Sequence, residues 1–128
     1  MRNKTLASFV FALICLLMVA IPAIAHHGVA AYDMTAKVTL KGTVAIFDWA
    51  NPHALINFTA QNDKGETERW TAETAAPVIL VRGGWNEHSL KPGDQITVVG
   101  YRAKNGAPSM ILQHLVLPNG KELGNLIP

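Results

Sequence analysis

The architecture of this chain follows from residues 38–49, VTLKGTVAIFDW. Apolar and polar residues alternate from Val38 to Lys41, and a strand pattern continues from Val44 to Trp49. Gly42 interrupts the run, and a glycine inside a strand often marks a bulge or a sharp bend because it has no side chain to pack. The stretch predicts one long strand, bent at Gly42, that can hydrogen-bond in two directions.

Two more strands are predicted directly after the bent one. Residues 54–61 alternate in polarity, and one face of this strand consists of Ala54, Ile56, Phe58 and Ala60. Residues 62–65, NDKG, form a hairpin loop with glycine where a positive φ is needed. Residues 66–73 form the next strand, with Trp70 and Ala72 facing inward.

The periodicity changes after the third strand. A short helix is expected from about Ala75 to Arg82, with Thr74 as its cap and Gly83-Gly84 at its end. Strands are then predicted at residues 95–103 and 109–117, joined by a turn at Asn105-Gly106.

The order strand, strand, strand, helix, strand, strand predicts an all-β domain with one short helix. It matches the five-stranded Greek-key barrel of the OB-fold, in which the helix closes one end. An open β-sandwich is the alternative, and it would usually contain about seven strands. The expected organisation is a signal peptide at 1–25, an extended N-terminal segment at 26–37, the OB-like barrel at 38–120 and a C-terminal tail at 121–128.

The first 25 residues have the features of a secretory signal peptide. Arg2 and Lys4 precede an apolar run from Leu6 to Ile21, and Ala23-Ile24-Ala25 supplies the small residues that a signal peptidase requires. The run is shorter than the ~20 residues that span a membrane, and no positive cluster follows it. We expect cleavage after Ala25 and no membrane span in the mature chain; an uncleaved anchor is the alternative.

Cleavage changes the charge and the cysteine content. The 128-residue chain has 11 Lys and Arg against 9 Asp and Glu, and its one cysteine, Cys15, lies in the leader. Because Arg2 and Lys4 are removed with the leader, the mature chain is formally neutral and free of cysteine. A neutral chain has no basic excess with which to bind nucleic acid or anionic lipid. Without cysteine it has no disulfide, thiolate nucleophile or cysteine-type zinc site.

Several motifs together resemble a family of small exported proteins of Gram-negative bacteria that is carried as a domain of unknown function. They are His26-His27-Gly28 with Tyr32-Asp33, Trp49-Ala50-Asn51-Pro52-His53, Gly84-Trp85, Leu90-Lys91-Pro92-Gly93-Asp94, and Gly100-Tyr101-Arg102-Ala103-Lys104-Asn105-Gly106. The resemblance covers nearly the whole mature chain. It implies a periplasmic location, and it brings no activity, cofactor or catalytic residue.

Three histidines form a candidate metal site after cleavage. His26 would become the first residue, so its α-amine and ring could bind the same ion, and His27 or His53 would add another imidazole. A tetragonal nitrogen site of this kind suits Cu(II). The alternatives are two solvated histidines at a mobile terminus and, for His53, a turn residue that hydrogen-bonds its own loop.

Aromatic and amide side chains near the loops form a candidate ligand-binding set. OB-folds bind oligonucleotides or oligosaccharides by stacking on their second and third strands. The candidates here are Trp49, Asn51, Trp85 and Tyr101. Trp70 is expected in the core because large aromatic side chains dominate burial.

The sequence offers little support for an enzyme. It lacks a glycine-flanked nucleophilic serine and a phosphate-binding loop. Asp33, Asp48 and Glu73 stand as isolated carboxylates, for which solvated or capping roles are expected. The predicted function is a non-enzymatic periplasmic binding module for a small ligand or an envelope protein, and the alternative is a protein that binds copper or another divalent metal.

Overall fold

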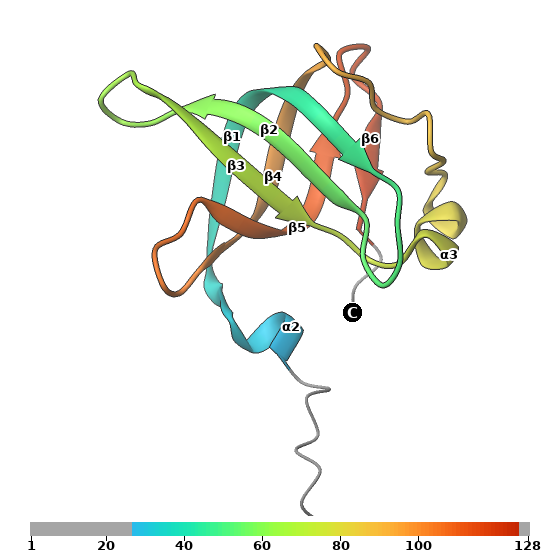
Figure 1. The fold of residues 1–128 in the computed structure, drawn as a ribbon, viewed down its shortest axis with the longest axis horizontal. Coiled ribbons are helices and arrows are strands. Elements are labelled where there is room, and N and C mark those ends of the chain that lie inside the picture. Colours follow the sequence, from blue (N-terminus) through green and yellow to red (C-terminus); the bar gives the residue numbers. More distant parts are fainter. Residues whose placement is uncertain (1–26, 126–128) are drawn as a thin grey trace, which may run out of the picture.

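The computed structural model describes residues 27–125, which form a small barrel of strands (Figure 1). The strands are β1 (Tyr32–Asp48), β2 (Leu55–Gln61), β3 (Thr67–Glu73), β4 (Gln95–Ala103), β5 (Ser109–Val116) and β6 (Glu122–Gly124). The helices of the described part are α2 (His27–Ala30) and α3 (Pro77–Leu80), and a 3-10 turn at Val81–Gly83 continues α3.

The strands close into a ring. The sheet order is β3-β2-β1-β4-β5-β6, and β3 also pairs with β5 in parallel. The hydrogen-bonded ring is therefore β1-β2-β3-β5-β4, and β6 is attached to β5 outside it. With a short helix between β3 and β4, this confirms the predicted OB-like Greek-key barrel.

Strand β1 makes the ring possible because it pairs with two neighbours. Its first part pairs with β4 and its second part with β2, while Gly42 and Thr43 have partners on both sides. A Cβ atom at Gly42 would lie 2.6 Å from the carbonyl oxygen of Thr59 and 2.6 Å from a ring carbon of Phe58. The strand thus changes partner at the predicted glycine, where the neighbouring chain leaves no room for a side chain.

The inward-facing side chains of the strands fill the barrel. The predicted inner face of β2 is buried, and so are Trp70 and Ala72 of β3. Strand β4 contributes Ile96 and Val98, and β5 contributes Met110. Burial of a large apolar side chain stabilises the fold by about 1.5–3 kcal/mol, so the alternation seen in the sequence also accounts for the core.

The segment between β3 and β4 closes one end of the barrel. Helix α3 is shorter than predicted and ends at Leu80. The 3-10 turn that continues it stops at Gly84, which has a φ of 83°. Its Leu80 is fully buried. The prediction that Thr74 caps this helix was wrong: Ala76 occupies the cap position, and the Thr74 hydroxyl donates to the carbonyl oxygen of Ala54 at 2.8 Å. Thr74 is itself buried, so its hydroxyl needs this nearby acceptor.

Regular structure extends beyond both ends of the predicted barrel. The described part of segment 26–37 contains α2 and the beginning of β1, and segment 121–128 contains β6. Leu123 of β6 is buried, and the side chain of Asn125 accepts a hydrogen bond from the backbone N–H of Ala75 at 2.9 Å. A three-residue strand is too short to show a period in the sequence, which explains why β6 was not predicted.

No helix within residues 27–125 is both long and apolar enough to cross a membrane. The predicted signal peptide at 1–25 lies outside the described residues.

Replacing Gly42 by alanine should destabilise the barrel. The new methyl group would overlap the Thr59 carbonyl and the Phe58 ring, and overpacking of this kind costs about 1–3 kcal/mol. Urea denaturation would measure the loss. Gly124→Ala is the control, because a Cβ there meets nothing within 4 Å; it should change the free energy of unfolding by less than about 0.5 kcal/mol. Equal stabilities for the two variants would contradict the tight approach at Gly42.

Candidate functional site

Three ionisable side chains from distant parts of the chain meet on the outer surface of the barrel. The hydroxyl of Tyr32, at the start of β1, donates to Glu73 Oε2 at 2.8 Å. Glu73 is the last residue of β3, and its Oε1 lies 3.6 Å from Nε2 of His53 in the β1–β2 loop. We call these residues the Tyr32–Glu73–His53 cluster. The start of β1, the end of β3 and the β1–β2 loop therefore bring a phenol, a carboxylate and an imidazole together, with the carboxylate between the other two.

Packing holds Tyr32 firmly. It is 8% exposed and forms a small outer cluster with Ala103 and Ile111, and Ile111 is the β5 residue that pairs with Glu73. Burial, followed by the hydrogen bond and the negative charge of Glu73, raises the pKa of Tyr32 from 10.0 to about 12. Tyr32 is therefore a neutral hydrogen-bond donor at physiological pH.

The ring of His53 has a defined orientation. Its Nδ1 lies 2.9 Å from the carbonyl oxygen of Thr74. Because a carbonyl only accepts hydrogen bonds, Nδ1 carries the proton, and in the neutral ring Nε2 keeps a free lone pair. The alternative reading of the sequence was that His53 hydrogen-bonds its own loop. The structure shows instead that the ring bonds to Thr74, which lies directly after β3. The side chains of His53 and Glu73 are 44% and 24% exposed, so a solvent-borne ligand can reach both.

The other two predicted metal ligands lie at the N-terminal limit of the structure. His26 lies outside the described residues, and His27 is the first residue of α2. Figure 1 shows α2 below the barrel, where β1 begins. Among residues 27–125, no three His, Cys, Asp or Glu side chains gather into a metal-binding group.

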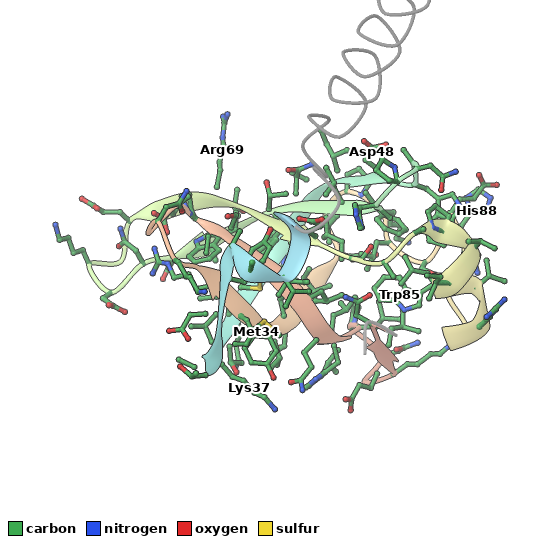
Figure 2. All side chains as sticks on the ribbon, turned by 90° about the horizontal axis from the view of Figure 1, so that it is seen from below. Met34, Lys37, Asp48, Arg69, Trp85 and His88 are labelled. Carbon is green, nitrogen blue, oxygen red and sulfur yellow. The ribbon has the colours of Figure 1, made fainter. Side chains whose placement is uncertain are left out.

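The two tryptophans of the predicted ligand-binding set belong to one aromatic group. Trp85 is 2% exposed, and its indole N–H donates to the carbonyl oxygen of Gly124 at 2.9 Å. Figure 2 shows Trp85 between α3 and the strands. The ring of Phe47 lies 6.0 Å from that of Trp85 and 5.5 Å from that of Trp49. Trp85 is therefore a core residue, and Trp49 is half-buried against the same core.

Asn51 and Tyr101 lie elsewhere. Asn51 is exposed in the β1–β2 loop. Tyr101 is half-buried on β4 beside the outer cluster, with Lys37 Nζ 6.0 Å from its ring centre. The four predicted residues are thus distributed over the core, a loop and the outer cluster, and they do not form one binding face.

The outer face of β2 and β3, where OB-folds stack their ligands, is polar here. The outward-facing residues are Leu55, Asn57, Thr59, Gln61, Thr67, Arg69, Thr71 and Glu73. Figure 2 shows Arg69 pointing away from the sheet. Because the aromatic residues Phe58 and Trp70 face inward, these two strands offer no ring on which a base or sugar could stack.

A polar groove lies where β1 changes partner. Its volume is about 580 Å³. Side chains from β1, β2, β3, β4 and the hairpin loop line it, and the polar ones are Thr39, Lys41, Thr43, Thr59, Gln61, Asp63, Thr67 and Gln95. Gln95 Nε2 donates to Thr43 Oγ1 at 2.9 Å. Hydroxyl and amide groups dominate this groove. Its charged side chains are one lysine and one aspartate, so its formal charge is zero.

Sequence reasoning missed Tyr32, Glu73 and the polar groove. Glu73 was expected to be an isolated carboxylate, yet it contacts two ionisable side chains. No local spacing links residues 32, 53 and 73. For the groove, the sequence contained only an indirect indication, namely the polar residues at the outer positions of two predicted strands.

A comparison with known protein families places the chain in a family. The model described as a family of unknown function (DUF6152) matches residues 12–111. The matched region includes the Trp49–His53 and Leu90–Asp94 motifs, and it confirms the resemblance noted in the sequence. No curated protein matches the chain.

The raised pKa of Tyr32 can be tested by titration. The chain has two tyrosines, so Tyr101→Phe leaves Tyr32 as the only one, and its tyrosinate absorbance should develop near pH 12. Adding Glu73→Gln should lower this midpoint because the negative charge is lost, although burial remains. Glu68→Gln is the control and should not move it. A midpoint that is indifferent to Glu73 would contradict the contact.

The same group should affect stability at high pH. The folded state holds the Tyr32 proton more tightly than the unfolded chain, whose tyrosine pKa is 10.0. The contribution to stability is therefore complete below pH 10 and is lost as pH rises toward about 12. Tyr32→Phe should remove this part of the pH dependence.

Proposed function

The chain belongs to the DUF6152 family, whose function is unknown, and from the geometry of its barrel we propose that it is a non-enzymatic binding module of the periplasm. Its ligand is a neutral, hydroxyl-rich molecule, such as an oligosaccharide, that binds in the polar groove. A surface glycan of an envelope protein would offer the same chemistry.

The groove carries this proposal. At about 580 Å³ it has the size of a small-molecule site, but its polar lining differs from the apolar lining of most such sites. Thr59, Gln61 and Thr67 offer donors and acceptors side by side on neighbouring strands. Such a surface favours a ligand that exchanges its hydrogen bonds with water for bonds to the protein.

Charge and location support the same choice of ligand. After loss of the predicted leader the chain is formally neutral, so it lacks the cationic field that draws nucleic acid to a protein. The absence of outward rings on β2 and β3 argues against single-stranded nucleic acid, which binds OB-folds by stacking, and a sugar in the groove would be bound by hydrogen bonds without stacking on these strands. The signal-peptide features of residues 1–25 support export to the periplasm.

Binding in the groove can be tested by NMR with maltotriose and chitotriose as probes. Chemical-shift changes should concentrate at the groove, and Gln61→Ala or Thr67→Ala should weaken binding about fivefold, as expected for one lost hydrogen bond. Gln113→Ala is the control, because Gln113 lies on β5 outside the groove. Shifts that map elsewhere, or no binding of either probe, would refute the proposed ligand.

Metal binding is a second candidate function, and one observation favours it. His53 Nε2 keeps a lone pair that is accessible to solvent, because Nδ1 is bound to Thr74. Tyr32 attaches the start of β1 beside this ring through Glu73. In this reading the mature N-terminus, His26 with His27, supplies nitrogen ligands that join His53 around Cu(II).

Calorimetric titration with Cu(II) tests this second function on exported protein whose first residue is established as His26 by mass spectrometry. One alanine added before His26 should weaken binding at least about tenfold, because it displaces the α-amine from the ring. His53→Ala should weaken binding too, whereas His88→Ala, at an exposed turn residue, should not. Unchanged affinity after the added alanine would contradict an N-terminal site.

A further inference from the structure

Beside the polar groove lies a second cavity, with a volume of about 280 Å³ and a different lining. Four of its seven lining side chains are apolar, and the full set is Lys41, Gln95, Ile96, Thr97, Val116, Leu117 and Pro118. We call it the apolar cavity. Because Lys41 and Gln95 also line the polar groove, the two cavities adjoin each other along these two side chains.

We propose that the ligand of the polar groove carries an apolar substituent and that this substituent binds in the apolar cavity. The inference rests on the proposed carbohydrate-binding function and deepens it, because it narrows the ligand to an amphipathic glycoside, such as a glycolipid. The apolar cavity lies just below the range of about 300–1,000 Å³ that is usual for a whole ligand. It therefore suits one part of a larger molecule whose sugar lies in the groove.

The register of the sheet builds the floor of the apolar cavity. Lys41 of β1 pairs with Thr97 of β4, and Thr97 pairs with Val116 of β5. Residues that pair directly across strands lie on the same face of a sheet. Because Ile96 and Val98, the neighbours of Thr97, are buried in the barrel, this row lies on the outer face. It leads from the edge of the polar groove to the apolar side chains.

The β5–β6 turn forms a wall of the apolar cavity. The backbone N–H of Leu117 donates to the carbonyl oxygen of Lys121 at 2.8 Å, and that of Gly120 donates to the carbonyl oxygen of Leu117 at 2.9 Å. Leu117 also packs against the core. The wall is thus in place before a ligand binds, which reduces the cost of ordering it. Since β6 lies outside the ring, this cavity is an addition to the five-stranded barrel.

The side chains on the boundary between the two cavities match a ligand that changes there from polar to apolar. Gln95 Nε2 donates to Thr43 Oγ1 at 2.9 Å, which orients the amide. Among the residues that the structure describes, no carboxylate forms an ion pair with Lys41. Its ammonium group can donate to an oxygen atom that joins the sugar to its substituent, while its methylene stem covers apolar surface.

Other apolar side chains on the surface provide matched controls. Helix α3 and the turn after it are the more exposed, with Val78 at 66% and Val81 at 58%, but neither residue lines the groove or the apolar cavity. Val99 is half-buried on β4, two residues after Thr97, and it also lines neither cavity. Val78 and Val99 can therefore receive the same substitution as Val116.

The test is titration of the exported protein with methyl β-maltoside and with octyl β-maltoside, below the concentration at which the latter forms micelles. Calorimetry should show that octyl maltoside binds at least about tenfold more tightly, as expected from burial of two or three methylene groups. Its heat-capacity change should be more negative, because apolar surface is buried. Its additional NMR chemical-shift changes should lie at Ile96, Thr97, Val116 and Leu117.

Val116→Thr replaces a methyl group by a hydroxyl group of similar size. It should weaken the binding of octyl maltoside about fourfold, the equivalent of one buried methylene group, and leave the binding of methyl maltoside unchanged. Val99→Thr and Val78→Thr should change the affinity for neither glycoside.

The outcomes separate this inference from the function on which it rests. If methyl maltoside binds in the groove and octyl maltoside binds no more tightly, the role of the apolar cavity is refuted and the carbohydrate-binding function stands. If the additional shifts lie on α3, or if Val78→Thr acts like Val116→Thr, the alkyl chain binds the exposed helix and the inference is again overturned. If neither glycoside binds, the carbohydrate-binding function fails as well. The shifts of the unaltered protein decide if Val116→Thr does not fold.

Discussion

The whole structure depends on the close approach of β1 to β2 at Gly42. At this point the strand has hydrogen-bonded neighbours on both sides, and a carbonyl oxygen occupies the space that a Cβ atom would need. Because β1 can bend here and pair first with β4 and then with β2, the sheet curls far enough for β3 to meet β5. Without this change of partner the five strands would form an open sheet with two exposed edges.

Closure of the barrel also creates the Tyr32–Glu73–His53 cluster. The short parallel contact of β3 with β5 places Glu73 beside Ile111, and Tyr32 packs over Ile111 from the far end of β1. His53 reaches the same carboxylate from the loop that follows β1. The cluster therefore forms only when the barrel is closed. Any ligand bound to it would stabilise the fold by mass action.

In many OB-folds, aromatic residues on the outer face of the second and third strands bind the ligand. Here the aromatic residues of these strands are buried, and the outer face is polar. Trp70 and Trp85 are buried, and Arg102 stacks on Trp70 with its guanidinium carbon 4.9 Å from the ring centre. The rings are thus used to fill a small barrel. What remains outside on β2 and β3 is suited to hydrogen bonding.

The sequence by itself determined the strands, the bend and the inner faces, because polarity with a period of two is a local property that one chain segment carries alone. It also indicated the barrel through the order of its elements. Only the tertiary structure decided that Tyr32, His53 and Glu73 meet, that Trp85 is buried and that β6 forms. The contacts of Tyr32, His53, Glu73 and Trp85 join residues 20 to 41 positions apart, and no spacing along the chain encodes such contacts until the ring has closed. Strand β6 pairs with the nearby β5, but its three residues are too few to show a period.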